Sequence, residues 1–244
     1  MRHYAVIGDP VEHSLSPEIY NELFLRHRVE ADFIRLRIKE EELCDIRSIT
    51  KELSGFAVTM PHKRSIIPYL DRLEVTAARC GAVNIVKREL GELVGCNTDG
   101  AGLVNAVHAM GFDPAGKRAA ILGRGGAALS AAFALSDCGA EVTLLVRSLS
   151  LGSPFAESIF AYHSEPCDIF INASPLGMQN NKSFDDFAFL ERLSPKLVFD
   201  MVYKREGETA LTEAASALGI KASSGYPMLY HQALLAFDIW QGQA

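Results

Sequence analysis

Short apolar runs alternate along the chain with stretches in which apolar residues recur every three or four positions, a pattern typical of α/β proteins. The apolar runs predict strands over residues 4–7, 31–38, 56–58, 82–87, 93–96, 118–122, 141–146, 168–172, 197–201 and 220–222. The amphipathic stretches predict helices over about 17–24, 40–53, 62–70, 75–80, 101–110, 123–138, 209–218 and 228–240. Ser16 suits the N-cap of the first helix and Pro17 its first position.

One predicted strand-to-helix junction, from Gly55 to Lys63, carries a candidate functional residue. Residues 56–58 form a short apolar strand, and Pro61 stops it because proline has no N–H to donate within a sheet. Proline is tolerated in the first turn of a helix. Lys63 therefore stands at the carboxyl end of a strand, where α/β proteins bind ligands. A solvated lysine in a first helical turn is the alternative interpretation.

A second candidate region follows the stretch 111–116, whose glycines and proline make it a possible boundary. The strand 118–122 leads into Gly123-Arg124-Gly125-Gly126-Ala127, and a helix and the strand 141–146 come next. This β-α-β unit is a variant of the dinucleotide-binding fingerprint, in which N–H groups at the helix start hold phosphate. A tight turn that binds nothing is the alternative.

The end of the strand 141–146 indicates which dinucleotide the turn would bind. Arg147 lies 24 positions after Gly123 (147 − 123), close to the ~20 residues at which the ribose-reading residue is expected. A carboxylate at this point favours NAD, whereas Arg147 favours the 2′-phosphate of NADP. Arg124 either reaches a phosphate from within the turn or extends into water.

Composition excludes several classes of protein. The 244 residues are 48% hydrophobic and 22% charged, as in ordinary globular proteins. The net charge of −6, without a basic run, argues against a nucleic-acid partner. No apolar run is long enough to span a bilayer, and the chain opens directly on a strand, so we expect neither a membrane partner nor a signal peptide.

Five cysteines are scattered without any Cys-x-x-Cys pair: Cys44, Cys80, Cys96, Cys138 and Cys167. An odd number of dispersed cysteines fits reduced thiols in a cytoplasm better than a disulfide framework or a zinc site. We therefore expect a cytoplasmic protein with no bound metal.

Six polar residues lie at or just beyond predicted strand ends and helix starts: Ser14, Ser16, Thr59, Lys63, Asn84 and Asp99. Parallel-sheet topology would gather these side chains at one edge of a sheet. Together they could hydrogen-bond a small polyol that carries a carboxylate. Taken singly, the serines and Asp99 could be helix caps, and Asn84 a turn residue.

In the order of its motifs the chain resembles the shikimate dehydrogenase family over almost its whole length. The motifs are His13-Ser14-Leu15-Ser16-Pro17, Val58-Thr59-Met60-Pro61-His62-Lys63, Ala82-Val83-Asn84, Asn97-Thr98-Asp99-Gly100, Gly123-Arg124-Gly125-Gly126-Ala127, Asn172-Ala173-Ser174-Pro175-Leu176-Gly177-Met178, Asp200-Met201-Val202-Tyr203, Gly225, Met228-Leu229 and Gln232-Ala233.

The resemblance implies two α/β domains and a reaction. An N-terminal substrate domain would comprise residues 1–100 and 226–244, with the C-terminal helix returning to it, and a Rossmann-type NADP-binding domain would comprise 101–225. The reaction would be the reversible NADPH-dependent reduction of 3-dehydroshikimate to shikimate, a step of aromatic amino-acid (chorismate) biosynthesis.

The resemblance also implies a role for each matching residue. Lys63 and Asp99 would form the catalytic pair, and either could take the proton in the oxidative direction. The substrate-binding residues would be Ser14, Ser16, Thr59, Asn84, Tyr203 and Gln232, of which the serines and Tyr203 would hold the carboxylate. The cofactor-binding residues would be Gly123, Arg124, Gly125, Gly126, Ala127, Arg147, Ser148, Met178, Gly225 and Met228.

The chain departs from the family's usual pattern at four points, of which one is the region 149–166, which is shorter than expected. Ala57 stands where the family often has Asn, Arg124 where the glycine turn usually has Ala, and Val146-Arg147-Ser148 where Asn-Arg-Thr is usual. These departures leave the chemistry intact and concern the recognition of the adenosine ribose. A quinate/shikimate dehydrogenase with broader substrate or cofactor use is one alternative function. A non-catalytic, ligand-sensing relative is another. For the oligomeric state, a monomer and a homodimer are both open.

Overall fold

The computed structural model describes residues 1–178, 181–205 and 207–242, and the chain divides into two compact units. Residues 1–99, together with the chain from Gln232 onward, form the first unit, and Gly100–His231 form the second. The divisions at 99/100 and 231/232 fall at the start of one helix and inside another, whereas the sequence analysis places them at 100/101 and 225/226. The stretch 111–116 lies within the second unit.

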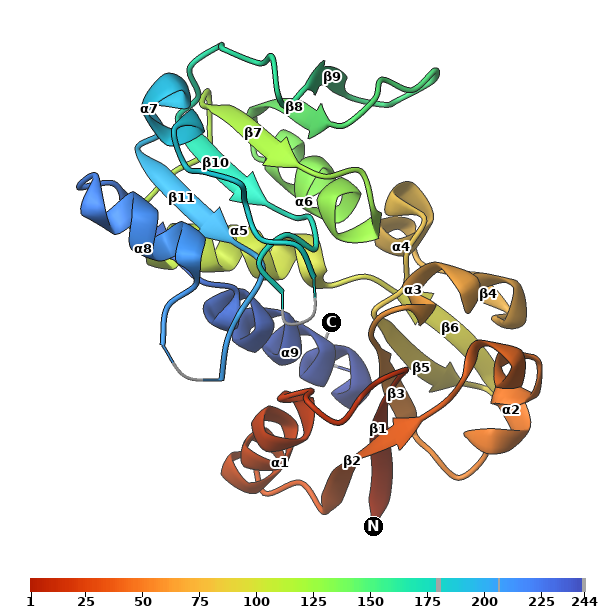
Figure 1. Ribbon diagram of the computed structural model, residues 1–244. Helices are drawn as coiled ribbons and strands as arrows, with labels where there is room; N and C mark the ends of the chain where they lie inside the picture. Colours follow the sequence, from red (N-terminus) through yellow and green to blue (C-terminus); the bar gives the residue numbers. More distant parts are fainter. Residues whose placement is uncertain (179–180, 206, 243–244) are drawn as a thin grey trace. The chain divides into compact units, whose positions relative to one another are not determined.

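The first unit contains a six-stranded mixed sheet in the order β2-β1-β3-β5-β6-β4 (Figure 1). Its strands are β1 (Arg2–Gly8), β2 (Ala31–Arg37), β3 (Gly55–Val58), β4 (Arg72–Leu73), β5 (Ile85–Glu89) and β6 (Glu92–Cys96). β1 is parallel to β2 and β3, and β5 is antiparallel to β3 and β6. The carboxyl ends of β1, β3 and β6 and the amino end of β5 therefore share one edge.

The helices of the first unit are short. They are α1 (Ser16–Arg26), the 3₁₀ helix η1 (Glu40–Asp45), α2 (Ile46–Ile49), α3 (His62–Ser65), the 3₁₀ helix η2 (Ile67–Tyr69) and α4 (Val75–Cys80). The single helix predicted over 40–53 is wrong: the segment buries Leu43 and Ile46, and residues three apart share one face of a 3₁₀ turn. The helix predicted over 62–70 is also interrupted, because Pro68 has no N–H to continue α3.

The C-terminal helix α9 (Tyr226–Gln241) completes the core of the first unit through Trp240. The Trp240 ring packs against the Tyr4 and Tyr20 rings with centroids 4.8 and 5.1 Å away, and its Nε1 donates to the Val86 carbonyl at 3.1 Å. A Cβ at Gly55 would stand 2.4 Å from Trp240 Nε1, so only glycine lets the indole approach β3 this closely.

The second unit is a doubly wound sheet of parallel strands in the order β12-β11-β10-β7-β8-β9. Its elements are α5 (Asp99–Ala109), β7 (Arg118–Leu122), α6 (Gly126–Asp137), β8 (Glu141–Val146), β9 (Ala156–Ile159), β10 (Ile169–Asn172), α7 (Phe189–Leu193), β11 (Leu197–Asp200), α8 (Ala210–Ala217) and β12 (Lys221–Ser223). Ala119 and Ile121 face α5 and α6, while Ala120 and Leu122 face α7 and α8. The order reverses beside β7, which places a topological switch point where the glycine turn begins.

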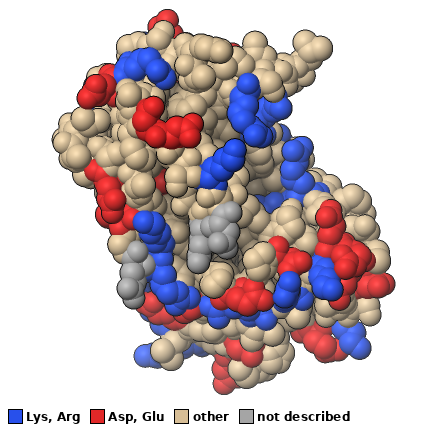
Figure 2. Space-filling view, viewed as in Figure 1, with Lys and Arg blue, Asp and Glu red and all other residues tan. Residues whose placement is uncertain are grey.

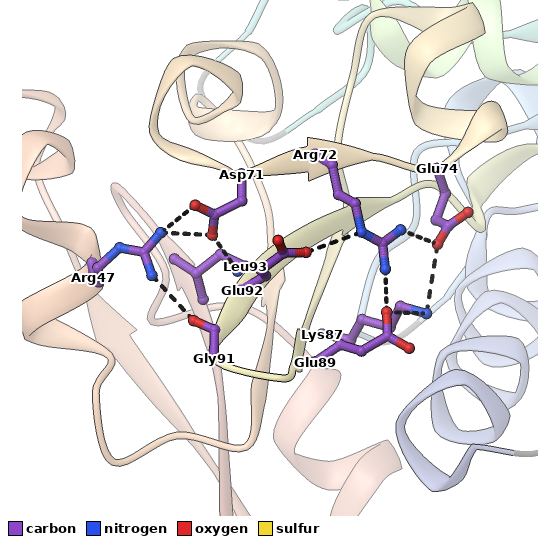
Figure 3. A network of polar contacts seen from close by, with 9 residues as sticks. All are labelled: Arg47, Asp71, Arg72, Glu74, Lys87, Glu89, Gly91, Glu92 and Leu93. Carbon is purple, nitrogen blue, oxygen red and sulfur yellow. Dashed lines mark hydrogen bonds and ion pairs between the residues drawn. The ribbon is translucent and has the colours of Figure 1, made fainter.

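Charged side chains cover the surface with both signs interspersed on the face shown in Figure 2. One network is drawn in Figure 3: Arg47 holds the Asp71 carboxylate at 2.6 and 2.7 Å, and Asp71 accepts the Leu93 N–H at 2.6 Å. Arg72 in β4 pairs with three carboxylates, those of Glu74, Glu89 and Glu92. These side chains are about half exposed, so solvent screening keeps the contribution of each pair small.

Candidate active site

Lys63 is placed by backbone contacts around the end of β3. The Thr59 N–H donates to the Ile7 carbonyl at 2.9 Å, which continues the pairing of β3 with β1. The buried His62 ring donates from Nε2 to the Ile38 carbonyl at 2.5 Å, and the Val83 N–H donates to the Lys63 carbonyl at 2.7 Å. Lys63 is the second residue of α3, as the strand-to-helix junction predicts.

The Lys63 ammonium lies in a hydrogen-bonded network with four other polar side chains. Lys63 Nζ donates to Asp99 Oδ2 at 2.6 Å, and Asn84 Nδ2 lies 2.9 Å from Asp99 Oδ1. Asn84 Nδ2 also lies 2.9 Å from Thr98 Oγ1 and 3.1 Å from Gln232 Oε1. Both Asp99 oxygens thus accept hydrogen bonds, and the Lys63 ammonium keeps two N–H groups for another acceptor.

Four sequence-predicted residues therefore come together, and the mixed sheet explains how. Asp99 follows β6 and Lys63 follows β3, at the carboxyl ends of two strands that run in the same direction. Asn84 precedes β5, which runs the opposite way, so the amino end of β5 reaches the same edge. Gln232 enters from α9. Asp99 does not cap α5 with its side chain; the Asn97 side chain accepts the Asp99 N–H at 3.0 Å instead.

Two serines meet at the start of α1. Ser14 Oγ donates to Ser16 Oγ at 3.2 Å and accepts the Ser16 N–H at 3.3 Å. Ser16 is the first helical residue and Leu15 the N-cap, so the prediction that Ser16 caps the helix is wrong by one position. The Ser16 hydroxyl therefore does not cap the helix. The hydroxyls of Ser14 and Ser16 lie side by side beyond the carboxyl end of β1.

Tyr20 is a residue of this region that the sequence analysis missed. It is fully buried on α1, and its ring stacks on Phe33 with centroids 4.4 Å apart. Among the described residues no hydrogen-bond partner lies within 3.5 Å of its hydroxyl, although the Gln232 side chain faces it. Burial raises the pKa of Tyr20 above its ordinary value of 10.0, so the phenol is neutral. An aromatic residue on the apolar face of a helix is usually a core residue, so the sequence gives no signal that Tyr20 belongs to the candidate site.

The glycine turn of the second unit has the geometry that a dinucleotide phosphate requires. Gly123 has φ +133°, and a Cβ there would stand 3.0 Å from the Ala173 carbonyl oxygen, so the turn needs glycine. Gly125 is the N-cap of the twelve-residue helix α6, and Gly126 begins it. Apart from its chain neighbours, no described atom lies within 4 Å of the Cβ position of Gly125, so this side of the backbone is open. The first N–H groups of any helix lack intrahelical acceptors. The residues present therefore fit the phosphates of a dinucleotide.

Arg124 lies against the end of β8, where the ribose-reading residues are predicted. Arg124 Nη1 donates to the Ser148 carbonyl at 3.2 Å, so its guanidinium is not simply extended into water. Arg147 and Ser148 are exposed at the end of β8. The sequence predicts no carboxylate here, but Glu157 of β9 comes within 3.9 Å of Arg124 and accepts hydrogen bonds from Ser150. The strand β9 was not predicted, and this carboxylate was missed with it.

The other predicted residues of the second unit lie on its loops and in its core. Met178 is partly buried in the loop after β10, and Tyr203 is partly buried in the loop after β11. A Cβ at Gly225 would stand 2.3 Å from the Met201 carbonyl oxygen, which makes glycine necessary there. Met228 is buried in the hydrophobic core that α5 and α6 form with the sheet. Thr59, in the first unit, lies at the end of β3 and is partly exposed.

The motif residues Asn172 and Asp200 organise two of these loops. Asn172 Nδ2 donates to Asp200 Oδ1 at 2.9 Å and to the Leu176 carbonyl at 3.0 Å, and Asn172 Oδ1 accepts the Ser174 hydroxyl at 2.6 Å. Asp200 Oδ1 also accepts the Val202 N–H at 3.1 Å. Burial raises the pKa of Asp200, and these donors oppose the rise. The pair therefore holds the loops that carry Met178 and Tyr203.

Two findings concern other kinds of site. Among the residues that the structure describes, three or more His, Cys, Asp and Glu side chains nowhere gather in a way that could hold a metal ion. The described helices include none with the length and apolar character needed to cross a membrane.

Comparison with known proteins gives the same picture. Residues 6–86 match the family model of the shikimate dehydrogenase substrate binding domain. A curated shikimate dehydrogenase (NADP(+)) of Desulfitobacterium hafniense (strain Y51) is 35% identical over 258 residues, covering 98% of this chain and 92% of that protein.

Solved structures align over nearly the full chain. Shikimate 5-dehydrogenase from Thermus thermophilus, in complex with NADP(H) and shikimate, is 30% identical with a TM-score of 0.87, covering 99% of this chain and 94% of that one. The 5-ketofructose reductase of a Gluconobacter species, in its ligand-free form, is 28% identical with a TM-score of 0.82, covering 99% and 93% of the two chains.

The mixed sheet with its Lys63 network and the Rossmann-type unit define the class of protein as an α/β oxidoreductase. Within that class, the chain belongs to the shikimate dehydrogenase family, because several relatives exceed 30% identity over almost its entire length. The family and the fold class that the sequence motifs imply are thereby confirmed.

Proposed function

We propose that this chain catalyses the reversible, NADPH-dependent reduction of 3-dehydroshikimate to shikimate, in aromatic amino-acid (chorismate) biosynthesis. The observation that carries the proposal is the 2.6 Å contact between Lys63 Nζ and Asp99 Oδ2 within a network of hydrogen-bonding side chains. The relatives support it, since curated proteins of similar sequence are shikimate dehydrogenases that use NADP(+).

In this reaction Lys63 would act on the oxygen of the ketone. When a ketone is reduced, negative charge develops on its oxygen, and a cation with a proton to give stabilises that charge. The Lys63 ammonium meets both requirements, and Asp99 orients it. We assign the proton to Lys63 because both Asp99 oxygens already accept hydrogen bonds. In the oxidative direction, neutral Lys63 would take the proton from the hydroxyl group.

The remaining polar residues would bind and orient the substrate. Thr59, Asn84 and Gln232 present hydroxyl and amide groups that suit the ring hydroxyls. Ser14 and Ser16 lie at the start of α1, where N–H groups and the helix dipole favour an anion, so they would hold the carboxylate. Tyr203 would also hold the carboxylate.

The second unit would hold NADP, and the first the substrate. Gly123, Gly125, Gly126 and Ala127 would face the phosphates, while Arg147, Ser148 and Arg124 would face the 2′-phosphate. Gly225, Met178 and Met228 would contact the nicotinamide. NADP(H) supplies or accepts the hydride, which is chemistry that the side chains lack. We further propose that the protein works in the cytoplasm as a monomer or homodimer.

Of the two alternatives, the first has specific support. The first alternative is a quinate/shikimate dehydrogenase with broader substrate or cofactor use. Broader cofactor use fits Val146, which stands where the family usually has Asn. Broader substrate use fits the similarity to a protein named 5-ketofructose reductase. A ligand-sensing relative would keep the binding residues without turnover.

The test is a spectrophotometric assay of cofactor reduction with shikimate and quinate, each with NADP and NAD. Reduction of NADP with shikimate alone supports the proposal. Comparable rates with quinate would indicate broader substrate use, and comparable rates with NAD would indicate broader cofactor use. Shikimate binding by calorimetry without turnover would indicate a sensor.

A further inference from the structure

The loop that carries Ser14 is held by an arginine of the neighbouring strand. Arg35 in β2 donates to the Ser14 carbonyl from Nε at 3.0 Å and from Nη2 at 2.6 Å. Arg35 Nη2 also bonds both oxygens of Glu18 in α1, at 2.7 and 2.6 Å. One guanidinium thus joins β2, the loop before α1 and the first turn of α1.

The position of Arg35 on its strand explains how it reaches the loop. Residues two apart on a strand point to the same face, and Phe33 stacks on Tyr20 of α1, so Arg35 shares the face that α1 covers. The side chain of Arg35 is 31% exposed, which is low for a charged residue. A planar guanidinium that donates twice to one carbonyl fixes the direction of that peptide group.

Fixing the Ser14 carbonyl orients the backbone that carries the Ser14 hydroxyl. That hydroxyl must stay within reach of Ser16 to accept the Ser16 N–H and to meet the Ser16 hydroxyl. The same guanidinium pairs with the Glu18 carboxylate, which ties β2 to the first turn of α1.

We propose that Arg35 is a positioning residue for the substrate carboxylate: it orients the loop that carries the Ser14–Ser16 pair. This inference rests on the proposed function, in which the two serines hold that carboxylate. In this role Arg35 would act through Ser14 and would not touch the reacting atoms. Its loss should therefore change the KM for shikimate and leave kcat and the KM for NADP almost unchanged.

Arg37 provides a matched control. It lies two residues further along β2, points to the same face and holds the same loop at Asp9 with a 2.6 Å ion pair. Arg37 does not contact Ser14, and its side chain is 57% exposed. A general need for positive charge or for loop anchoring would affect both arginines, whereas the proposed role affects Arg35 alone.

The experiment measures kcat, both KM values and the thermal midpoint for Arg35→Met, Arg35→Lys, Arg37→Met and Arg35→Met/Glu18→Gln. We expect Arg35→Met to raise the KM for shikimate roughly tenfold, the scale of one lost charge-assisted hydrogen bond. Arg35→Lys should fold like the parent and recover part of this loss, because it keeps the charge but not the planar fork. The double variant should match Arg35→Met, because the proposed role acts through the Ser14 carbonyl.

An unchanged KM for shikimate in Arg35→Met and Arg35→Lys would overturn the inference. So would equal increases in Arg35→Met and Arg37→Met, or parallel increases in both KM values with a fall in the thermal midpoint. Ser14→Ala and Ser16→Ala, measured alongside, separate this failure from that of the proposed function. If the serine variants lose shikimate affinity and the Arg35 variants do not, only the role of Arg35 is wrong; if the serine variants keep it, the assignment of the carboxylate site is wrong as well.

Discussion

Lys63 and Asp99 are 36 residues apart in sequence, yet their side chains form an ion pair of 2.6 Å with unequal exposure. The Asp99 side chain is 7% exposed and the Lys63 side chain 24%. The carboxylate is thus fixed inside the unit, whereas part of the ammonium faces outward. This asymmetry fits the proposed roles, in which Lys63 acts on the ligand and Asp99 orients it.

Replacing Lys63 tests this division of roles. Lys63→Ala should lower kcat for shikimate oxidation by about 10²-fold or more, because it would remove the proposed proton-transfer group. The KM for shikimate should change less, since Asn84, Thr59 and the serines remain. Arg64→Ala, at the exposed next position of α3, is the control and should behave like the parent. A near-normal kcat in Lys63→Ala would mean that the lysine has no catalytic role.

The shared contact between Asn84 and Gln232 predicts coupling between the two residues. Asn84 Nδ2 lies 3.1 Å from Gln232 Oε1, and both side chains are buried. In a double-mutant cycle with Asn84→Ala and Gln232→Ala, the losses of shikimate affinity should be non-additive by roughly 0.5–3 kcal/mol, as for residues in one network. Calorimetry on the four proteins measures this. Strict additivity would show that the two side chains act on the ligand independently.

The identity of the cofactor should depend on Arg147. Arg147→Ala should cost roughly 1.5–3 kcal/mol of NADP affinity, the scale of a hydrogen bond to a charged group. NAD affinity should hardly change, because NAD has no 2′-phosphate. The measurement is kcat/KM for both cofactors in the parent, Arg147→Ala and Arg124→Ala. Equal losses with NADP and NAD would mean that Arg147 supports the fold instead of reading the phosphate.

Arg124→Ala tests whether Arg124 contacts the 2′-phosphate or only holds the end of β8, where it donates to the Ser148 carbonyl. If Arg124 reaches the phosphate as well, its removal should also weaken NADP more than NAD. If it only holds the end of β8 in place, both cofactors should bind more weakly.

The Arg47–Asp71 pair predicts a pH-dependent contribution to stability. The hydrogen bonds from Arg47, and then the Leu93 N–H, lower the pKa of Asp71 below its usual 3.8. A lowered pKa stabilises the folded state above pH 3.8, and this contribution disappears as the pH falls through the folded pKa. Arg47→Met should therefore be less stable than the parent to urea at neutral pH, with a gap that narrows below pH 3.8.

Lys51→Met is the control for that comparison, because Lys51 is an exposed cation without an ion pair in the part of the chain that the structure describes. Its stability should follow that of the parent at every pH. A gap between Arg47→Met and the parent that stays constant well below the ordinary pKa of an aspartate would assign the effect to packing of the arginine stem.

Several parts of the fold were predictable because they depend on local pattern. The strands at 118–122 and 141–146 match β7 and β8, and the helix at 75–80 matches α4. Each of these segments has an unbroken apolar or helical pattern and clear punctuation at its ends. The helix at 40–53 failed because local periodicity does not distinguish one long α-helix from a 3₁₀ segment followed by a single α-helical turn.

The sequence by itself determined the α/β class, the position of Lys63 at a strand end and the glycine turn after β7, because these follow from short-range pattern and backbone sterics. Its motifs also indicated the polar residues that form the Lys63 network. Only the tertiary structure decided that Asn84 reaches Asp99, since this depends on the antiparallel direction of β5. Tertiary contacts alone also placed Tyr20 beside Gln232, Glu157 near Arg124, and Arg35 on the Ser14 carbonyl. A single sequence carries no signal for such pairs, because each joins elements whose separate patterns are satisfied without it.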